Sequence, residues 1–195
     1  MKKVIAIALA LVMLLGLCAC AASGDKKTND EPAASTDGKK TIGILMPTKE
    51  QTIWSIQGER LTAAFENAGY ATAIEYAEDD SAKQAMQIEN MITKGVDALV
   101  IVAVDCAALT DACEKAKDAG IYVIAEDRLI TNTEAVDYYI TFDLTRMGEL
   151  QGQYIVDTLD LENQSGPFTL EIFSGSQDDT NAISFYQGAM NKLQP

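Results

Sequence analysis

Polar and charged side chains follow several apolar runs of this 195-residue sequence, at the points where we expect β-strands to end. The run at 121–125 (IYVIA) leads into Asp127 and Arg128, and the run at 97–103 (DALVIVA) is soon followed by Asp105. Further candidates of this kind are Lys49 and Trp54 after the run at 41–46, and Asn181 after the run at 167–175.

These residue types suit a ligand rich in hydroxyl groups. Aspartate accepts hydrogen bonds, arginine donates them through a rigid fork, and asparagine does both, so together they match the donors and acceptors of a sugar. Trp54 is the only tryptophan, and its ring could stack on the C–H face of a sugar ring. Two plainer interpretations stay open, in which Trp54 is a core aromatic and Asp127 and Arg128 form a solvated turn.

An alternation of strand and helix patterns would bring these side chains together. Strands are predicted at six apolar runs, 41–46, 70–76, 97–103, 121–125, 138–142 and 167–175. Helical spacing of apolar residues predicts three helices that end at Gly69, Gly95 and Gly120, and Ser81 is the predicted N-cap of the helix that ends at Gly95. Two further helices are predicted, one carrying Met147 to Leu159 and a last one at 181–193. The pattern predicts an α/β fold with a Rossmann-like parallel sheet and helices on both faces. Ligands of such sheets bind at the carboxyl ends of the strands.

Composition excludes several kinds of function. The chain has no histidine, which rules out Ser-His or Cys-His nucleophiles and histidine zinc sites, and we find no glycine-rich phosphate loop. We therefore expect neither metal nor cofactor. A net charge of −14 argues against nucleic acid as a partner. Cys106 and Cys113 are predicted to be small core residues. A glycosidase that pairs Asp127 with Asp105 or Asp179 stays an alternative.

The N-terminus has the pattern of an export signal. Two lysines precede an uncharged apolar stretch that is shorter than a membrane span, so residues 1–19 are predicted to be a signal peptide. The residues before Cys20 resemble the lipobox of bacterial lipoproteins, which implies a lipid on Cys20, and the polar residues 20–40 are predicted to be a flexible tether. An ordinary secretory signal cut elsewhere is the alternative.

Five segments resemble the multiple-sugar periplasmic binding proteins of the ribose and xylose type: IGILMPTKEQTIW, IENMITKGVDALVI, VIAEDRLI, YYITFD and GPFTLEIFSGSQDDTNA. The resemblance implies a periplasmic binding protein of type 1, with two Rossmann-like lobes and a monosaccharide such as xylose, arabinose, galactose or ribose between them. It implies that Asp127 and Arg128 bind sugar hydroxyls, that Trp54 stacks, and that Asn181 contributes from the second lobe. Lys49 and Asp105 match cleft positions less firmly.

The resemblance also implies the partners and the division into lobes. We expect a monomer without enzyme activity that delivers sugar to an ABC permease from the outer face of the cell membrane. A first lobe is predicted at 41–141 and a partial second lobe at 142–195, as in a truncated form of such proteins. A binding protein for a sugar-like autoinducer or a chemoreceptor is the alternative.

Three positions depart from the family pattern. Ile53, Glu126 and Leu144 stand where relatives often have arginine, tyrosine and asparagine, so the identity of the sugar is left open.

Overall fold

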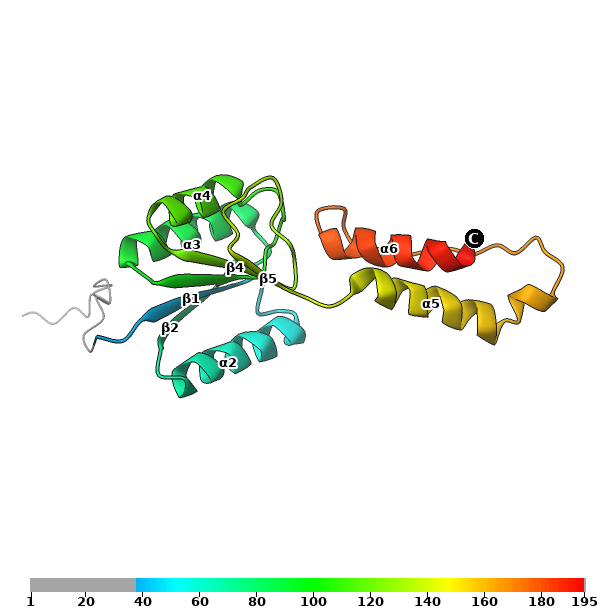
Figure 1. The fold of residues 1–195 in the computed structure, drawn as a ribbon, viewed down its shortest axis with the longest axis horizontal. Helices are drawn as coiled ribbons and strands as arrows, with labels where there is room; N and C mark the ends of the chain where they lie inside the picture. Colours follow the sequence, from blue (N-terminus) through cyan, green and yellow to red (C-terminus); the bar gives the residue numbers. More distant parts are fainter. Residues whose placement is uncertain (1–37, 195) are drawn as a thin grey trace, which may run out of the picture. The chain divides into compact units, whose positions relative to one another are not determined.

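A parallel β-sheet lies at the centre of the fold between residues 41 and 140. The computed structural model describes residues 38–194, and its sheet has five strands in the order β2-β1-β3-β4-β5. The strands are β1 (Thr41–Met46), β2 (Ala71–Tyr76), β3 (Ala98–Ile101), β4 (Tyr122–Glu126) and β5 (Tyr138–Ile140), and every neighbouring pair is parallel (Figure 1). The predicted α/β class with a parallel sheet is therefore confirmed.

Helices cover both faces of this sheet (Figure 1). Helix α2 (Thr52–Asn67) lies on one face, and α3 (Ser81–Lys94) and α4 (Thr110–Asp118) lie on the other. Gly95 ends α3 in the left-handed conformation at φ 70°, as predicted. The predicted N-cap of α3 is wrong by one residue, because the carboxylate of Asp80 rather than the Ser81 hydroxyl accepts from the Lys83 N–H at 3.0 Å.

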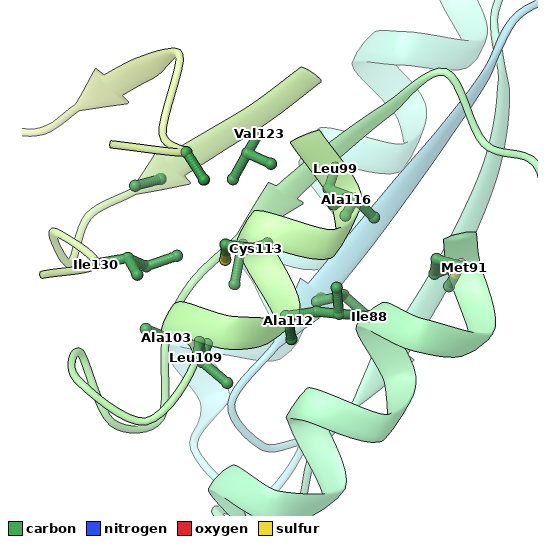
Figure 2. Packing of buried hydrophobic residues seen from close by; sticks show 14 of the residues in the cluster. Ile88, Met91, Leu99, Ala103, Leu109, Ala112, Cys113, Ala116, Val123 and Ile130 are labelled. Carbon is green, nitrogen blue, oxygen red and sulfur yellow. The ribbon is translucent and has the colours of Figure 1, made fainter. Parts of the chain in front are cut away.

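The apolar core lies on both sides of the central strands. One cluster joins α3 and α4 to strands β3 and β4, through residues such as Ile88, Leu99, Ala112 and Val123 (Figure 2). A second cluster packs Trp54 of α2 against the opposite face. Cys106 and Cys113 are both free and buried, so their prediction as core residues is confirmed, and burial raises the pKa of the Cys113 thiol to about 12.

The residues after β5 form two helices that pack closely on each other. Helix α5 (Leu144–Thr158) is followed by a short 3-10 turn (Leu161–Asn163) and later by α6 (Thr180–Leu193). Gly148 and Gly188 lie at the contact, where a Cβ on Gly188 would come within 2.9 Å of the Glu149 backbone nitrogen and would overlap the Thr145 carbonyl oxygen. Glycine is required at this position because the two backbones approach so closely.

The predicted strand at 167–175 does not form. The segment is irregular, and Phe173 within it is 94% exposed. A strand needs a neighbour to pair its N–H and C=O groups, and the sheet of the described residues holds no sixth strand beside this segment. The apolar stripe of α5 is also exposed, with Tyr154 at 71%. Among residues 38–194, no helix is both long enough and apolar enough to cross a membrane.

Candidate functional site

The loop after β4 holds Asp127 and Arg128 in a fixed conformation. Asp127 has a φ of 62°, and its N–H donates to the Ile140 carbonyl of β5 at 2.8 Å. Its own carbonyl accepts from the hydroxyls of Tyr139 and Thr141. Because the backbone of this residue bonds to β5 in both directions, the loop is tied to the edge of the sheet.

The guanidinium of Arg128 points inward from this loop. Its Nη1 donates to the Ala103 carbonyl, just after β3, at 2.9 Å, and its carbon lies 5.3 Å from the centre of the Trp54 ring. Only 17% of the side chain is exposed. The interpretation of the pair as a solvated turn is therefore wrong for Arg128, because its charge is held between β3, α2 and its own loop.

The first turn of α6 completes the cluster. Asn181 donates from Nδ2 to Asp127 Oδ1 at 2.8 Å, and an Asp179 oxygen lies 3.1 Å from Arg128 Nε. Although this distance makes an ion pair, the Nε–H is not directed at the oxygen and therefore has no hydrogen-bond acceptor. At the start of α6, Asn181 thus contacts Asp127 and Asp179 contacts Arg128.

Trp54 is a core residue and a site residue at once. Its side chain is 6% exposed and packs in the apolar cluster on the α2 face, as the core interpretation predicts. Its indole N–H donates to Gln51 Oε1 at 3.1 Å, and its ring faces Arg128. In this conformation the clearest contact of the ring is the guanidinium, and little of the ring surface is open to a ligand.

Glu126 and Gln57 form a second polar pair beside the cluster. The Gln57 amide donates to Glu126 Oε1, while Glu126 Oε2 is buried and has no hydrogen-bond partner among the described residues. Burial and the neighbouring Asp127 carboxylate raise the pKa of Glu126 to about 7, against a smaller opposing effect of the Gln57 bond. Burial also raises the pKa of Asp127, although Arg128 and Asn181 oppose this.

The six predicted ligand-binding residues separate into two groups. The structure brings Trp54, Asp127, Arg128 and Asn181 together. Lys49 lies elsewhere, with its ammonium 4.8 Å from the centre of the Tyr76 ring, where it lines a hollow of about 510 Å³. Asp105 accepts from the N–H groups of Ala107 and Ala108 and so holds its own loop. The predicted lipidation site, Cys20, lies outside the described residues.

Sequence reasoning missed three residues of this region as ligand-binding candidates, namely Asp179 of the cluster and the neighbouring pair of Glu126 and Gln57. Asp179 stands near Asn181 in a run of polar residues whose individual roles the pattern did not separate. Gln57 carried a usable signal, because it is three residues after Trp54 and so on the same face of the helix. The described part of the chain contains no group of three or more His, Cys, Asp or Glu side chains placed to hold a metal ion.

Several known proteins that are similar to this chain are sugar-binding proteins. The chain is 50% identical over 168 residues to the multiple sugar-binding periplasmic protein SbpA of Azospirillum brasilense, covering 86% of this chain and 47% of SbpA. It is 50% identical over 164 residues to the multiple sugar-binding periplasmic receptor ChvE of Rhizobium radiobacter, covering 84% and 46%. The chain thus spans about half the length of the curated relatives it matches.

Solved structures agree with these relatives. An ABC transporter solute-binding protein from Clostridium phytofermentans with bound β-D-glucose is 46% identical with a TM-score of 0.78, covering 80% of this chain and 48% of that one. A carbohydrate transporter solute-binding protein from Chloroflexus aurantiacus in complex with D-glucose is 39% identical with a TM-score of 0.71, covering 80% and 46%.

The sequence model of one protein family, the periplasmic binding protein domain, matches residues 42–195. These residues include nearly the whole sheet and the cluster around Arg128. The chain therefore belongs to the periplasmic binding protein domain family, whose members bind substrates and are not enzymes.

Proposed function

We propose that this chain contributes the binding site of a substrate-binding protein that captures a monosaccharide for an ABC importer. The observation that carries the proposal is the cluster of Trp54, Asp127, Arg128 and Asn181 at the carboxyl edge of a parallel sheet. That edge is where open α/β sheets bind their ligands. The sugar-binding names of the relatives support the same conclusion.

The contacts of the cluster suggest how a sugar would be held. Asp127 with Asn181, and Arg128 with Asp179, each pair an acceptor with a donor. A sugar hydroxyl both donates and accepts, so it can enter between such partners and bond to each. In this mechanism the pairs seen here are replaced by protein–sugar–protein bridges that join the β4 loop to α6, and Trp54 holds Arg128 in place.

Placement outside the cytoplasm is part of the same proposal. The named relatives are periplasmic proteins, and residues 1–19 of this chain have the pattern of an export signal. We place the lipid anchor on Cys20, the polar tether at 20–40, a first lobe at 41–141 and the beginning of a second lobe at 142–195. The partners are then a monosaccharide, an ABC permease and the membrane surface.

A role in sensing is a second candidate. One solved relative is the fructose-binding periplasmic domain of a hybrid two-component system, which is 29% identical with a TM-score of 0.68 and covers 79% of this chain. A periplasmic sugar-binding domain of similar fold can therefore be part of a two-component system. Transport and sensing share the site and differ in the partner that reads it.

Calorimetric titration of the protein expressed from its own gene tests the proposal. Ribose, xylose, arabinose, glucose and galactose are titrated separately, and we expect at least one of them to bind. Asp127→Ala should abolish that binding because it removes the acceptor that Asn181 meets, whereas the matched control Asp118→Ala on the exposed end of α4 should not. Absence of binding by every sugar, or equal binding by the Asp127 variant, would contradict the proposal.

A further inference from the structure

Carboxylates outnumber cations in the cluster around Arg128. Glu126, Asp127 and Asp179 surround one guanidinium, and that guanidinium already donates to the Ala103 carbonyl and pairs with Asp179. Lys49, the other cation predicted at this edge, lies over the Tyr76 ring instead. In the part of the chain that the structure describes, Glu126 thus has no cationic partner of its own, and a neutral Gln57 amide is its hydrogen-bond donor.

Two buried acceptors of the cluster have no donor among residues 38–194. Glu126 Oε2 is one, and Oδ1 of Asn181 is the other, on a side chain that is only 6% exposed. The Nδ2 of the same amide bonds to Asp127, and the charge of Asp127 also acts on the carboxyl group of Glu126. Buried acceptors normally have partners, so a pair of orphans here indicates a place for a hydrogen-bond donor that binds from outside the chain.

The donor that suits this place best is a cation. A positive charge would stabilise the ionised form of both buried acids, which a neutral hydroxyl does only through its dipole. The described residues offer no arrangement fit for a metal ion, so the cation has to come with an organic ligand.

We propose that Glu126 makes this site selective for a hexosamine, a monosaccharide whose protonated amino group donates to Glu126 Oε2 while its hydroxyls bond to Asp127, Arg128 and Asn181. The inference rests on the proposed function, because it names the sugar class of that same site. The amino group takes the position beside Glu126 that the charge distribution leaves open, and Asn181 Oδ1 is the other buried acceptor of the cluster that lacks a donor among the described residues.

The test compares matched sugars that differ only in the group on carbon 2. Glucosamine and glucose, and galactosamine and galactose, are titrated by calorimetry into the protein expressed from its own gene at pH 7. We expect each amino sugar to bind about tenfold or more tightly than its partner, since a charge-assisted hydrogen bond is worth about one factor of ten over a neutral one. Glu126→Gln, which keeps the shape and removes the charge, should abolish the preference.

Two controls separate selectivity from folding. Glu59→Gln removes an equal charge from the exposed face of α2 and should keep the preference. The pH dependence of glucosamine binding by the unsubstituted protein is a second control. An ammonium ligand requires ionised Glu126, whose pKa is about 7 when the site is free. Affinity for glucosamine should therefore fall about fivefold from pH 7 to pH 6. The raised pKa of Asp127 acts in the same direction, Arg128 and Asp179 are the other charged groups of the cluster, and Gln57 carries no titratable group.

The possible outcomes are distinct. Equal or tighter binding of the neutral hexoses, a preference that survives in Glu126→Gln, or glucosamine affinity that rises toward pH 6 would each overturn the inference and leave the proposed sugar site standing. Failure of every sugar, amino or neutral, to bind would overturn the proposed function and this inference with it.

Discussion

Replacing Arg128 by alanine should weaken both sugar binding and folding, by amounts that the structure allows to be separated. The side chain makes three contacts, with the Ala103 carbonyl, the Trp54 ring and the Asp179 carboxylate. A bound sugar would add hydrogen bonds to the same guanidinium. Losing these charged bonds should cost about 2–4 kcal/mol of binding, which is roughly thirtyfold or more in affinity.

The folding cost follows from the contacts already present. A hydrogen bond to a charged group contributes about 1.5–3 kcal/mol, a partly buried cation–π contact about 0.5–1, and a partly exposed ion pair under about 1. These contributions overlap, and water can reach some of the groups left behind. We expect a net loss of about 2–3 kcal/mol, or a fall of about 4–12 °C in Tm for a domain of this size.

Calorimetry on the best-binding sugar and thermal unfolding without ligand measure the two costs independently. Arg60→Ala, an exposed arginine on α2, is the matched control and should change neither. At 25 °C the variant should still be almost fully folded, so its loss of affinity does not come from unfolded protein. Parent-like affinity combined with a lower Tm would refute the reasoning and make Arg128 a structural residue only.

Three further predictions concern other parts of the chain. Gly188→Ala should push α5 and α6 apart, because the added Cβ would overlap the Thr145 carbonyl oxygen, and Tm should fall by several degrees. The control Asn191→Ala, on the exposed face of α6, should leave Tm unchanged. The folded-state pKa of Glu126, about 7, exceeds the ordinary value of 4.5, so the stability of the protein should fall as pH rises between these two values. Glu126→Gln should make this fall less steep when unfolding midpoints are measured from pH 5 to 8. A steeper fall in the variant would contradict the prediction. A labelled fatty acid should be incorporated by the parent and lost in Cys20→Ala, and an unlabelled, soluble parent would disprove the anchor.

Local patterns were enough to predict the sheet and the helices that cover it. Short apolar runs separated by amphipathic segments ending in glycine predicted β1 to β5 and α2 to α4, and the structure has these elements in the same places. The prediction worked because each element follows from its own periodicity and stop signal. It was wrong at 167–175, where an equally apolar run forms no strand, because a strand depends on a neighbour that periodicity does not reveal.

The candidate site was only partly within reach of the sequence. The residue types, and for Trp54, Asp127 and Arg128 also the sheet edge, follow from the order of strands and helices. Asn181 was selected because it follows a predicted strand at 167–175 that does not form, and it reaches the cluster from the start of α6 instead. The sequence could not show that Lys49 lies over Tyr76 or that Asp105 holds its own loop, because both depend on side-chain direction at a strand end. Contacts between residues far apart in the chain, such as Asn181 with Asp127, exist only once the fold is formed.

The sequence by itself determined the fold class, the family resemblance and the chemical character of the site, because these depend on residue type and spacing. Tertiary structure alone decided which charges meet. It paired Arg128 with Asp179 and buried Glu126 beside Asp127, where one carboxylate oxygen of Glu126 has no donor from the described residues. The pKa of a carboxyl group depends on its exposure to water and on the charges within a few ångströms, and neither quantity is fixed until the β4 loop, α2 and α6 come together.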